Sequence, residues 1–212
     1  MKIQPDDLND MGYQLMDSMD QHNLTPFIIR HLKKRTASSA IWEYSHLIAL
    51  IAIYYMFLHG IHGGEISFGK AFLSLLAGYI FSIIIAPIHE LIHYLAFKLM
   101  GAKKVTFKVN FKKFYILCNA HNFVANRKEI RFVGLAPFVL LSAMLILLIL
   151  ISGPQLSFFL MGLLIAHTTC CMGDFGILSY LDFHGDNEVV SFDDQVKGIT
   201  CFYKKTVSDC NV

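Results

Sequence analysis

The chain has 212 residues, of which 55% are hydrophobic and 16% are charged, and its net charge at pH 7 is +2. Soluble domains carry closer to a quarter charged residues, so this deficit, together with a mean hydropathy of +0.50, indicates a membrane protein. The near-neutral charge and the lack of a basic, aromatic-rich run give no reason to expect a nucleic-acid partner. The five cysteines are an odd set without CxxC spacing, which argues against a disulfide framework and a thiolate zinc site.

Residues 1–40 are predicted to form a polar cytosolic tail. They contain five aspartates and lack the early apolar stretch of a signal peptide. We expect at most a short helix from about Leu8 to Met19. The segment ends on a patch of basic residues, Arg30, Lys33, Lys34 and Arg35.

Four stretches are long and apolar enough to cross a bilayer as helices, which takes about 20 residues each. Gly153-Pro154 separates the last two. The prediction is an all-α polytopic membrane protein whose four transmembrane helices make up residues 41–182. The stretches run approximately over Ile41–Leu58, Ala71–Met100, Phe132–Ile151 and Leu156–Leu181.

The distribution of basic residues predicts the orientation of these helices. Residues 1–40 hold five Lys or Arg, residues 101–131 hold eight and the C-terminal tail holds three, whereas residues 59–70 hold one. The positive-inside rule then places both termini and the second loop in the cytosol. We therefore expect a multi-pass protein of the cell membrane, with the lipid bilayer as a partner.

The loop 101–131 is predicted to contain a short β-hairpin against the membrane surface, because Val105–Phe111 alternates with period two and Phe114–Cys118 follows as a second β-like run. A basic amphipathic loop that binds lipid headgroups is a compatible alternative. Residues 183–212 are predicted to form a cytosolic tail. A group of polar residues at its start is expected to be a solvated turn and not a metal site: Asp182, His184, Asp186 and Glu188.

The second apolar stretch contains the motif His89-Glu-Leu-Ile-His93. Residues four apart lie on one face of a helix, so both imidazoles can bind one zinc ion. Glu90 projects from the adjacent face, where it can take a proton from water as a general base. Ionisable groups at membrane depth are costly and usually functional. The motif predicts a hydrolytic Zn2+ site with Glu90 as the catalytic residue; a buried polar cluster without metal is the alternative.

A catalytic zinc site usually has a third protein ligand, and Asp174 in the fourth apolar stretch is the best candidate. His93 and Asp174 each lie seven residues before the cytosolic end of their own predicted helix, which puts both about 10 Å deep. Gly173 and Gly176 are expected to let the helices approach closely.

Two other residues of the fourth stretch remain open as ligands. His167 lies two turns before Asp174 and is expected to support the site more than to bind metal. Cys170 lies one turn before Asp174, but sulfur is less usual in a hydrolytic site of this type. Pro87 is expected to kink the second helix just before His89, and Pro137 has a similar effect in the third.

The motifs around these residues resemble the zincin peptidase family of bacterial membrane proteins known by its DUF3267 domain. The resemblance rests on the His89–His93 motif, Gly134-Leu-Ala-Pro-Phe138, Gly173-Asp174 and Phe192-Asp-Asp-Gln195, and covers about residues 75–205. The layout is also similar, more remotely, to site-2 protease-type intramembrane metalloproteases. That resemblance implies zinc ligands at His89, His93 and Asp174 and a base at Glu90.

The leading hypothesis is an integral membrane zinc metalloprotease that cleaves membrane-embedded or membrane-proximal protein or peptide substrates. A metal-binding membrane protein without hydrolytic activity, such as a sensor or assembly factor, is the alternative. A small transporter is a third possibility, but the sequence has no internal repeat to support it.

Overall fold

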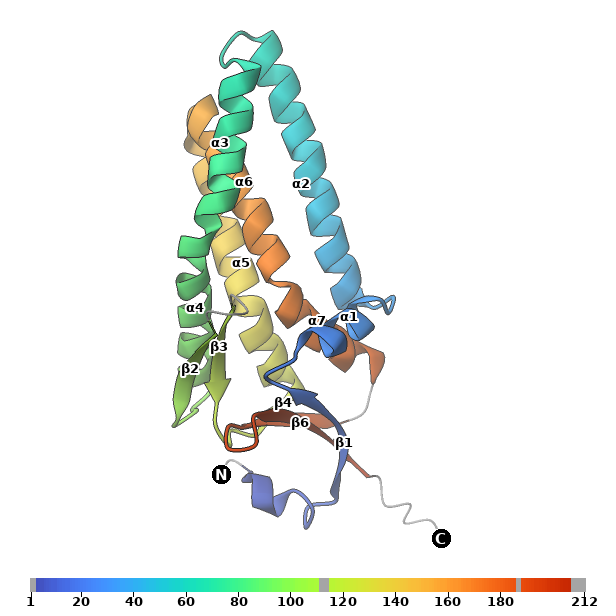
Figure 1. Cartoon of the computed structure of the whole chain (residues 1–212). Helices are drawn as coiled ribbons and strands as arrows, with labels where there is room; N and C mark the ends of the chain where they lie inside the picture. Colours follow the sequence, from blue (N-terminus) through green and yellow to red (C-terminus); the bar gives the residue numbers. More distant parts are fainter. Residues whose placement is uncertain (1–2, 111–114, 186–187, 207–212) are drawn as a thin grey trace.

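The computed structural model describes residues 3–110, 115–185 and 188–206, and Figure 1 shows an elongated helical bundle with the strands gathered at one end. Short 3-10 turns lie at Pro5–Asp7 and Ser82–Ile84. The helices are α1 (Thr25–Leu32), α2 (Ala37–His62), α3 (Phe68–Phe81), α4 (Ile85–Leu99), α5 (Arg127–Ile151), α6 (Pro154–Cys170) and α7 (Met172–Phe183).

The predicted apolar stretches correspond to the long helices of the bundle. In the described part of the chain, α2, the α3–α4 pair and α5 are each long and apolar enough to cross a membrane. The fourth stretch is α6 and α7, which bend by 45° at Cys171 and together pass the same test. Few residues in the first three are buried inside the protein, so their apolar side chains face outward, as they do in a membrane protein.

Proline and polar caps explain where several helices begin. Pro87 has no N–H to offer the Ile83 carbonyl and its ring crowds that carbonyl, so α3 and α4 are separated by the 3-10 turn at Ser82–Ile84. Asn126 caps α5 by accepting hydrogen bonds from the N–H groups of Lys128 and Glu129.

The structure corrects the all-α prediction, because the two predicted tails pair in a four-stranded antiparallel sheet. The strand order is β1 (Tyr13–Asp20), β6 (Ile199–Lys205), β5 (Val189–Asp194) and β4 (Ala125–Asn126). The expected helix from Leu8 to Met19 is wrong, because β1 occupies most of it and pairs with β6 from Tyr13 opposite Lys205 to Asp20 opposite Ile199. Hydrogen bonding to the distant strand β6 here outweighs the local conformational preference of the β1 residues.

The predicted hairpin is present as β2 (Val105–Asn110) and β3 (Tyr115–Ala120), which pair antiparallel from Val105 opposite Ala120. The part of the prediction that falls on residues 111–114 lies outside the described residues. Both sheets lie at the same end of the bundle (Figure 1), which agrees with a shared side for the second loop and the chain's end segments. Which side of a membrane this is remains a prediction.

A hydrophobic core joins the helices to the sheet. It contains Phe175 and Tyr180 of α7, Phe202 of β6 and Phe27 of the amphipathic helix α1. Within the bundle, α3 and α6 touch through their backbones, because a Cβ on Gly162 would lie 2.0 Å from the Leu75 carbonyl oxygen. Small residues permit such close helix contacts in membranes.

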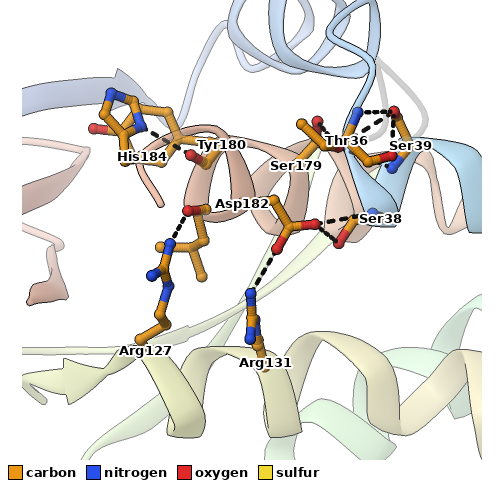
Figure 2. Close-up of polar contacts among 10 residues, drawn as sticks. Thr36, Ser38, Ser39, Arg127, Arg131, Ser179, Tyr180, Asp182 and His184 are labelled. Atoms are coloured by element: carbon orange, nitrogen blue, oxygen red, sulfur yellow. Dashed lines mark hydrogen bonds and ion pairs between the residues drawn. The ribbon is translucent and has the colours of Figure 1, made fainter. Parts of the chain in front are cut away.

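The polar residues after the fourth stretch hold helix ends together. Asp182 accepts hydrogen bonds from the backbone N–H of Ser38 at 2.9 Å and from Arg131 at 2.6 Å (Figure 2). The His184 ring bonds to the Tyr180 carbonyl instead, at 2.8 Å. Asp182 therefore ties α7 to the start of α2 and to α5, while Asp186 lies outside the described residues.

Candidate metal centre

His89 and His93 lie one turn apart on α4, and both are buried at 7% exposure. Their Nε2 atoms face each other at 3.1 Å. The helical spacing of four residues thus brings the two imidazoles to one point, as the motif predicts.

Asp174 reaches the same point from the first turn of α7. Its Oδ2 lies 3.2 Å from Nε2 of His89 and its Oδ1 lies 3.2 Å from Nε2 of His93. This turn follows directly after the bend at Cys171 between α6 and α7. Contrary to expectation, the two glycines do not account for the close approach of α7 to α4. A Cβ on Gly173 would meet nothing within 4 Å, and Gly176 packs against Ile28 of α1.

The tautomer of His93 is set by a carbonyl group on α5. Nδ1 of His93 lies 3.0 Å from the Val133 oxygen, which accepts only from a protonated nitrogen. Nε2 of His93 then presents a lone pair to the other Nε2 and to the Asp174 carboxylate. A ring nitrogen of His93 and the carboxylate oxygens of Asp174 thus direct lone pairs to one place, an arrangement that a cation stabilises.

Pro137 explains why the Val133 carbonyl is free to hold His93. In a regular helix this carbonyl accepts a hydrogen bond from the N–H four residues later, which is position 137. Pro137 lies inside the continuous helix α5 and has no N–H. The expected effect of Pro137 therefore appears as a released acceptor and not as a break in the helix.

The convergent atoms fit zinc. With zinc–nitrogen and zinc–oxygen bonds of about 2.0–2.1 Å, ligands in a tetrahedral site are about 3.3 Å apart. The observed separations among His89, His93 and Asp174 are 3.1–3.2 Å. Two imidazoles and one carboxylate leave a fourth position for water or substrate, as in catalytic zinc sites.

The other candidate ligands lie on the far side of His89 or away from the site. Cys171 Sγ is 4.0 Å from Nδ1 of His89, the ring nitrogen that does not face Asp174, and 3.8 Å from Nε2 of His167. The rings of His167 and His89 pack edge to face. Cys170 is exposed. Donor atoms of His89, His167 and Cys171 thus lie within 4.8 Å of one another and form a second group that could hold a metal ion, while Cys170 takes no part in either group.

Glu90 lies beside the cluster and is oriented by the hairpin. Its Oε2 accepts a hydrogen bond of 2.7 Å from the backbone N–H of Cys118 in β3, which leaves Oε1 for another partner. Burial, and secondarily the charge of Glu90, raises the pKa of the Cys118 thiol to about 12, so it stays protonated at neutral pH.

A buried polar network fastens β3 to the four-stranded sheet. Asp193 accepts hydrogen bonds from the Ala120 N–H at 3.1 Å, from Thr200 Oγ1 at 2.7 Å and from Gln21 Nε2 at 3.3 Å. Lys108 of β2 and Asn119 of β3 donate to the other end of the Gln21 side chain. The network places the edge of β3, and with it the Cys118 N–H, next to Glu90.

A cavity of about 140 Å3 lies between the cluster and the sheet. Glu90, His93 and Asp174 form one side of it. Strands β5 and β6 form the opposite side, with Phe192, Thr200 and Phe202. The cavity is mostly apolar apart from these site residues and the polar network, so it offers a nonpolar space directly beside Glu90.

Three participants were not predicted from the sequence. The Val133 carbonyl and the Cys118 N–H are backbone groups, which any residue type can supply. Cys171 lies next to the predicted alternative Cys170, but only the bend between α6 and α7 decides which of the two turns inward. The absent N–H of Pro137 is the one signal in the sequence that points to the Val133 carbonyl.

The comparison with protein families agrees with this site. The family model DUF3267, described as "Putative zincin peptidase", matches residues 82–187, which run from the 3-10 turn before α4 to beyond α7. No curated protein and no solved structure matches the chain. The match covers half of the chain and includes His89, Glu90, His93 and Asp174, so the chain belongs to the DUF3267 family.

Proposed function

We propose that the protein is an integral membrane zinc metalloprotease that hydrolyses peptide bonds of membrane-embedded or membrane-proximal substrates. His89, His93 and Asp174 hold the zinc ion and Glu90 is the general base. The observation that carries the proposal is the meeting of three ligand groups from α4 and α7 at 3.1–3.2 Å, with a carboxylate beside them.

In the proposed reaction, each residue of the site has its own role. Zinc, when bound, polarises a peptide carbonyl and makes water more acidic. Glu90 takes the proton of the attacking water at Oε1, because the Cys118 N–H occupies Oε2. The same carboxyl group then delivers the proton to the departing amine. The Val133 carbonyl keeps the lone pair of His93 Nε2 directed into the site throughout.

The position of the site supports a substrate in or near a membrane. The cluster lies on α4 and α7, which belong to two of the apolar spans, near the bundle end that carries both sheets. A peptide segment leaving the bilayer at that end passes the cavity. Under the predicted orientation, cleavage takes place near the cytosolic face.

The test compares zinc content and cleavage in purified, detergent-solubilised protein. Glu90→Gln should retain one equivalent of zinc and lose cleavage of a fluorophore-quencher peptide carrying a transmembrane sequence. His89→Ala and Asp174→Ala should lose zinc. The exposed residue Glu43 provides the matched control, since Glu43→Gln changes the same group outside the site.

Two results would overturn parts of the proposal. Cleavage that survives Glu90→Gln at the wild-type rate rules out Glu90 as the base. Bound zinc with no cleavage of transmembrane or soluble peptides by the wild-type protein favours a non-catalytic metal-binding protein, the second candidate function from the sequence.

A further inference from the structure

The cavity beside Glu90 is a binding pocket of defined size and polarity. It borders Glu90, His93 and Asp174 on one side, so whatever fills it lies next to the reacting groups. Its remaining wall combines residues from α5, β3, β4, β5 and β6. The N-terminal segment also reaches it through Met19 of β1.

Three polar side chains on the wall of the cavity, those of Asn119, Asp193 and Thr200, already take part in the polar network. Both Asp193 oxygens accept hydrogen bonds, one from the Ala120 N–H and the other from Thr200 and Gln21. Asn119 donates to the Gln21 side chain. A guest that forms hydrogen bonds with these side chains has to break the network, whereas an apolar guest leaves it intact.

The volume of the cavity sets the size of the guest. A protein cavity of about 150 Å3 lined by aliphatic and aromatic side chains accepts one benzene molecule. The cavity here measures about 140 Å3, and apolar residues such as Phe97, Phe123 and Ile177 line it. It therefore has room for one branched aliphatic or aromatic side chain and not for two.

We propose that this cavity is a specificity pocket that takes one large apolar side chain of the substrate, of the Leu or Phe type, adjacent to the scissile bond. The inference rests on the proposed function, since it assumes that a peptide reaches the metal centre. It adds a substrate class: peptides with a bulky apolar residue next to the bond that is cut.

Small hydroxamates test the pocket without requiring cleavage. Acetohydroxamate carries a methyl group and binds zinc alone, whereas isovalerohydroxamate carries an isobutyl group with three more carbon atoms. Burial of those carbons should make isovalerohydroxamate bind about 50-fold more tightly to the zinc-loaded protein. Isothermal titration calorimetry on the full chain in detergent measures both affinities.

A variant that fills the pocket isolates its contribution. Ala125 of β4 lines the cavity and is 5% exposed, and Ala125→Leu adds three carbon atoms there. The variant should bind acetohydroxamate as the wild type does and lose the 50-fold preference for the isobutyl compound. Ala77→Leu makes the same change on the exposed face of α3 and should keep the preference.

The outcomes separate the two proposals. If acetohydroxamate fails to bind the zinc-treated wild-type protein, the metal centre itself is refuted. If acetohydroxamate binds and the isobutyl group adds nothing, the pocket is refuted while the metal centre stands. A preference that persists in Ala125→Leu, with acetohydroxamate binding showing that the variant is folded, also refutes the pocket.

Discussion

Replacement of Pro137 by alanine should weaken zinc binding while it stabilises the metal-free protein. The new N–H at position 137 competes with His93 for the Val133 carbonyl, which lies 3.0 Å from Nδ1 of His93. Loss of a group that orients a metal ligand costs 10–100-fold in affinity. We expect the lower value, about tenfold, because the carbonyl oxygen has two lone pairs and can still serve both donors in part.

The effect on stability has the opposite sign. Proline inside a helix costs about 3 kcal/mol relative to alanine. Pro137 is fully buried, and its two lost ring methylenes contribute about 1.6 kcal/mol. The metal-free variant should therefore gain about 1.4 kcal/mol, which corresponds to an increase in Tm of roughly 3–6 °C for a chain of this size.

Zinc titration against a competing chelator and thermal unfolding in the presence of excess chelator measure the two effects separately. Pro154→Ala is the control, because Pro154 is exposed at the first position of α6, where no N–H is missed. Unchanged zinc affinity in Pro137→Ala would refute the role of the Val133 carbonyl. A parallel loss of affinity and stability would instead indicate general damage to α5.

Three further changes test other features of the structure. Gly162→Ala would place its Cβ about 1.4 Å closer to a backbone oxygen than the 3.4 Å of an ordinary contact, so Tm should fall by roughly 4–10 °C, whereas Gly69→Ala, with nothing within 4 Å, should not lower it. Asp193→Asn puts an NH2 group where both oxygens of Asp193 accept hydrogen bonds, so the contact between β3 and the four-stranded sheet should weaken. The backbone N–H groups of β3 should then exchange hydrogen faster, as measured by mass spectrometry. Zinc content should stay unchanged, and cleavage should fall about tenfold. Burial and a hydrogen bond to Glu188 raise the pKa of Tyr13 to about 12 from 10.0. The stability that this contact adds is therefore complete below pH 10 and is lost as the pH rises through 12. Ultraviolet absorbance at alkaline pH follows the ionisation, and Tyr13→Phe should remove this pH dependence of stability.

Hydropathy and the positions of proline predicted most of the bundle from the sequence. A long apolar run is a local signal, so the spans corresponding to α2, the α3–α4 pair and α5 follow from it. The break at Cys171 does not follow, since Thr169, Cys170, Cys171 and Met172 are all compatible with a continuous helix. Asp174 follows directly after that break, so the break affects where its side chain points. From the sequence, only the depth of Asp174 in the membrane could be predicted, and only on the assumption of straight helices.

The four-stranded sheet shows where local patterns fail. Its strand β1 contains Asp17, Ser18 and Asp20, which are poor strand formers, and its partner β6 lies about 185 residues later in the chain. β5 and β6 do carry a strand signal in Val189, Val190 and Ile199 to Tyr203 around a turn at Gly198. The prediction of a tail for residues 183–212 did not use that signal. It therefore also missed the part of the cavity wall that β5 and β6 form.

The order of the strands implies that the cavity beside the metal centre is completed late in the synthesis of the chain. β6 joins β1 to β5, and its residues Thr200 and Phe202 line the cavity, yet it is made after every helix of the bundle. A nascent chain that has completed α7 already contains His89, His93 and Asp174 and the parts of the cavity wall that come from α5, β3 and β4, but it lacks the part that comes from β5 and β6. Under the proposed function, a metal ion can therefore bind before the pocket is complete, and the pocket is completed only when β6 has been synthesised and pairs with β1, which precedes α1.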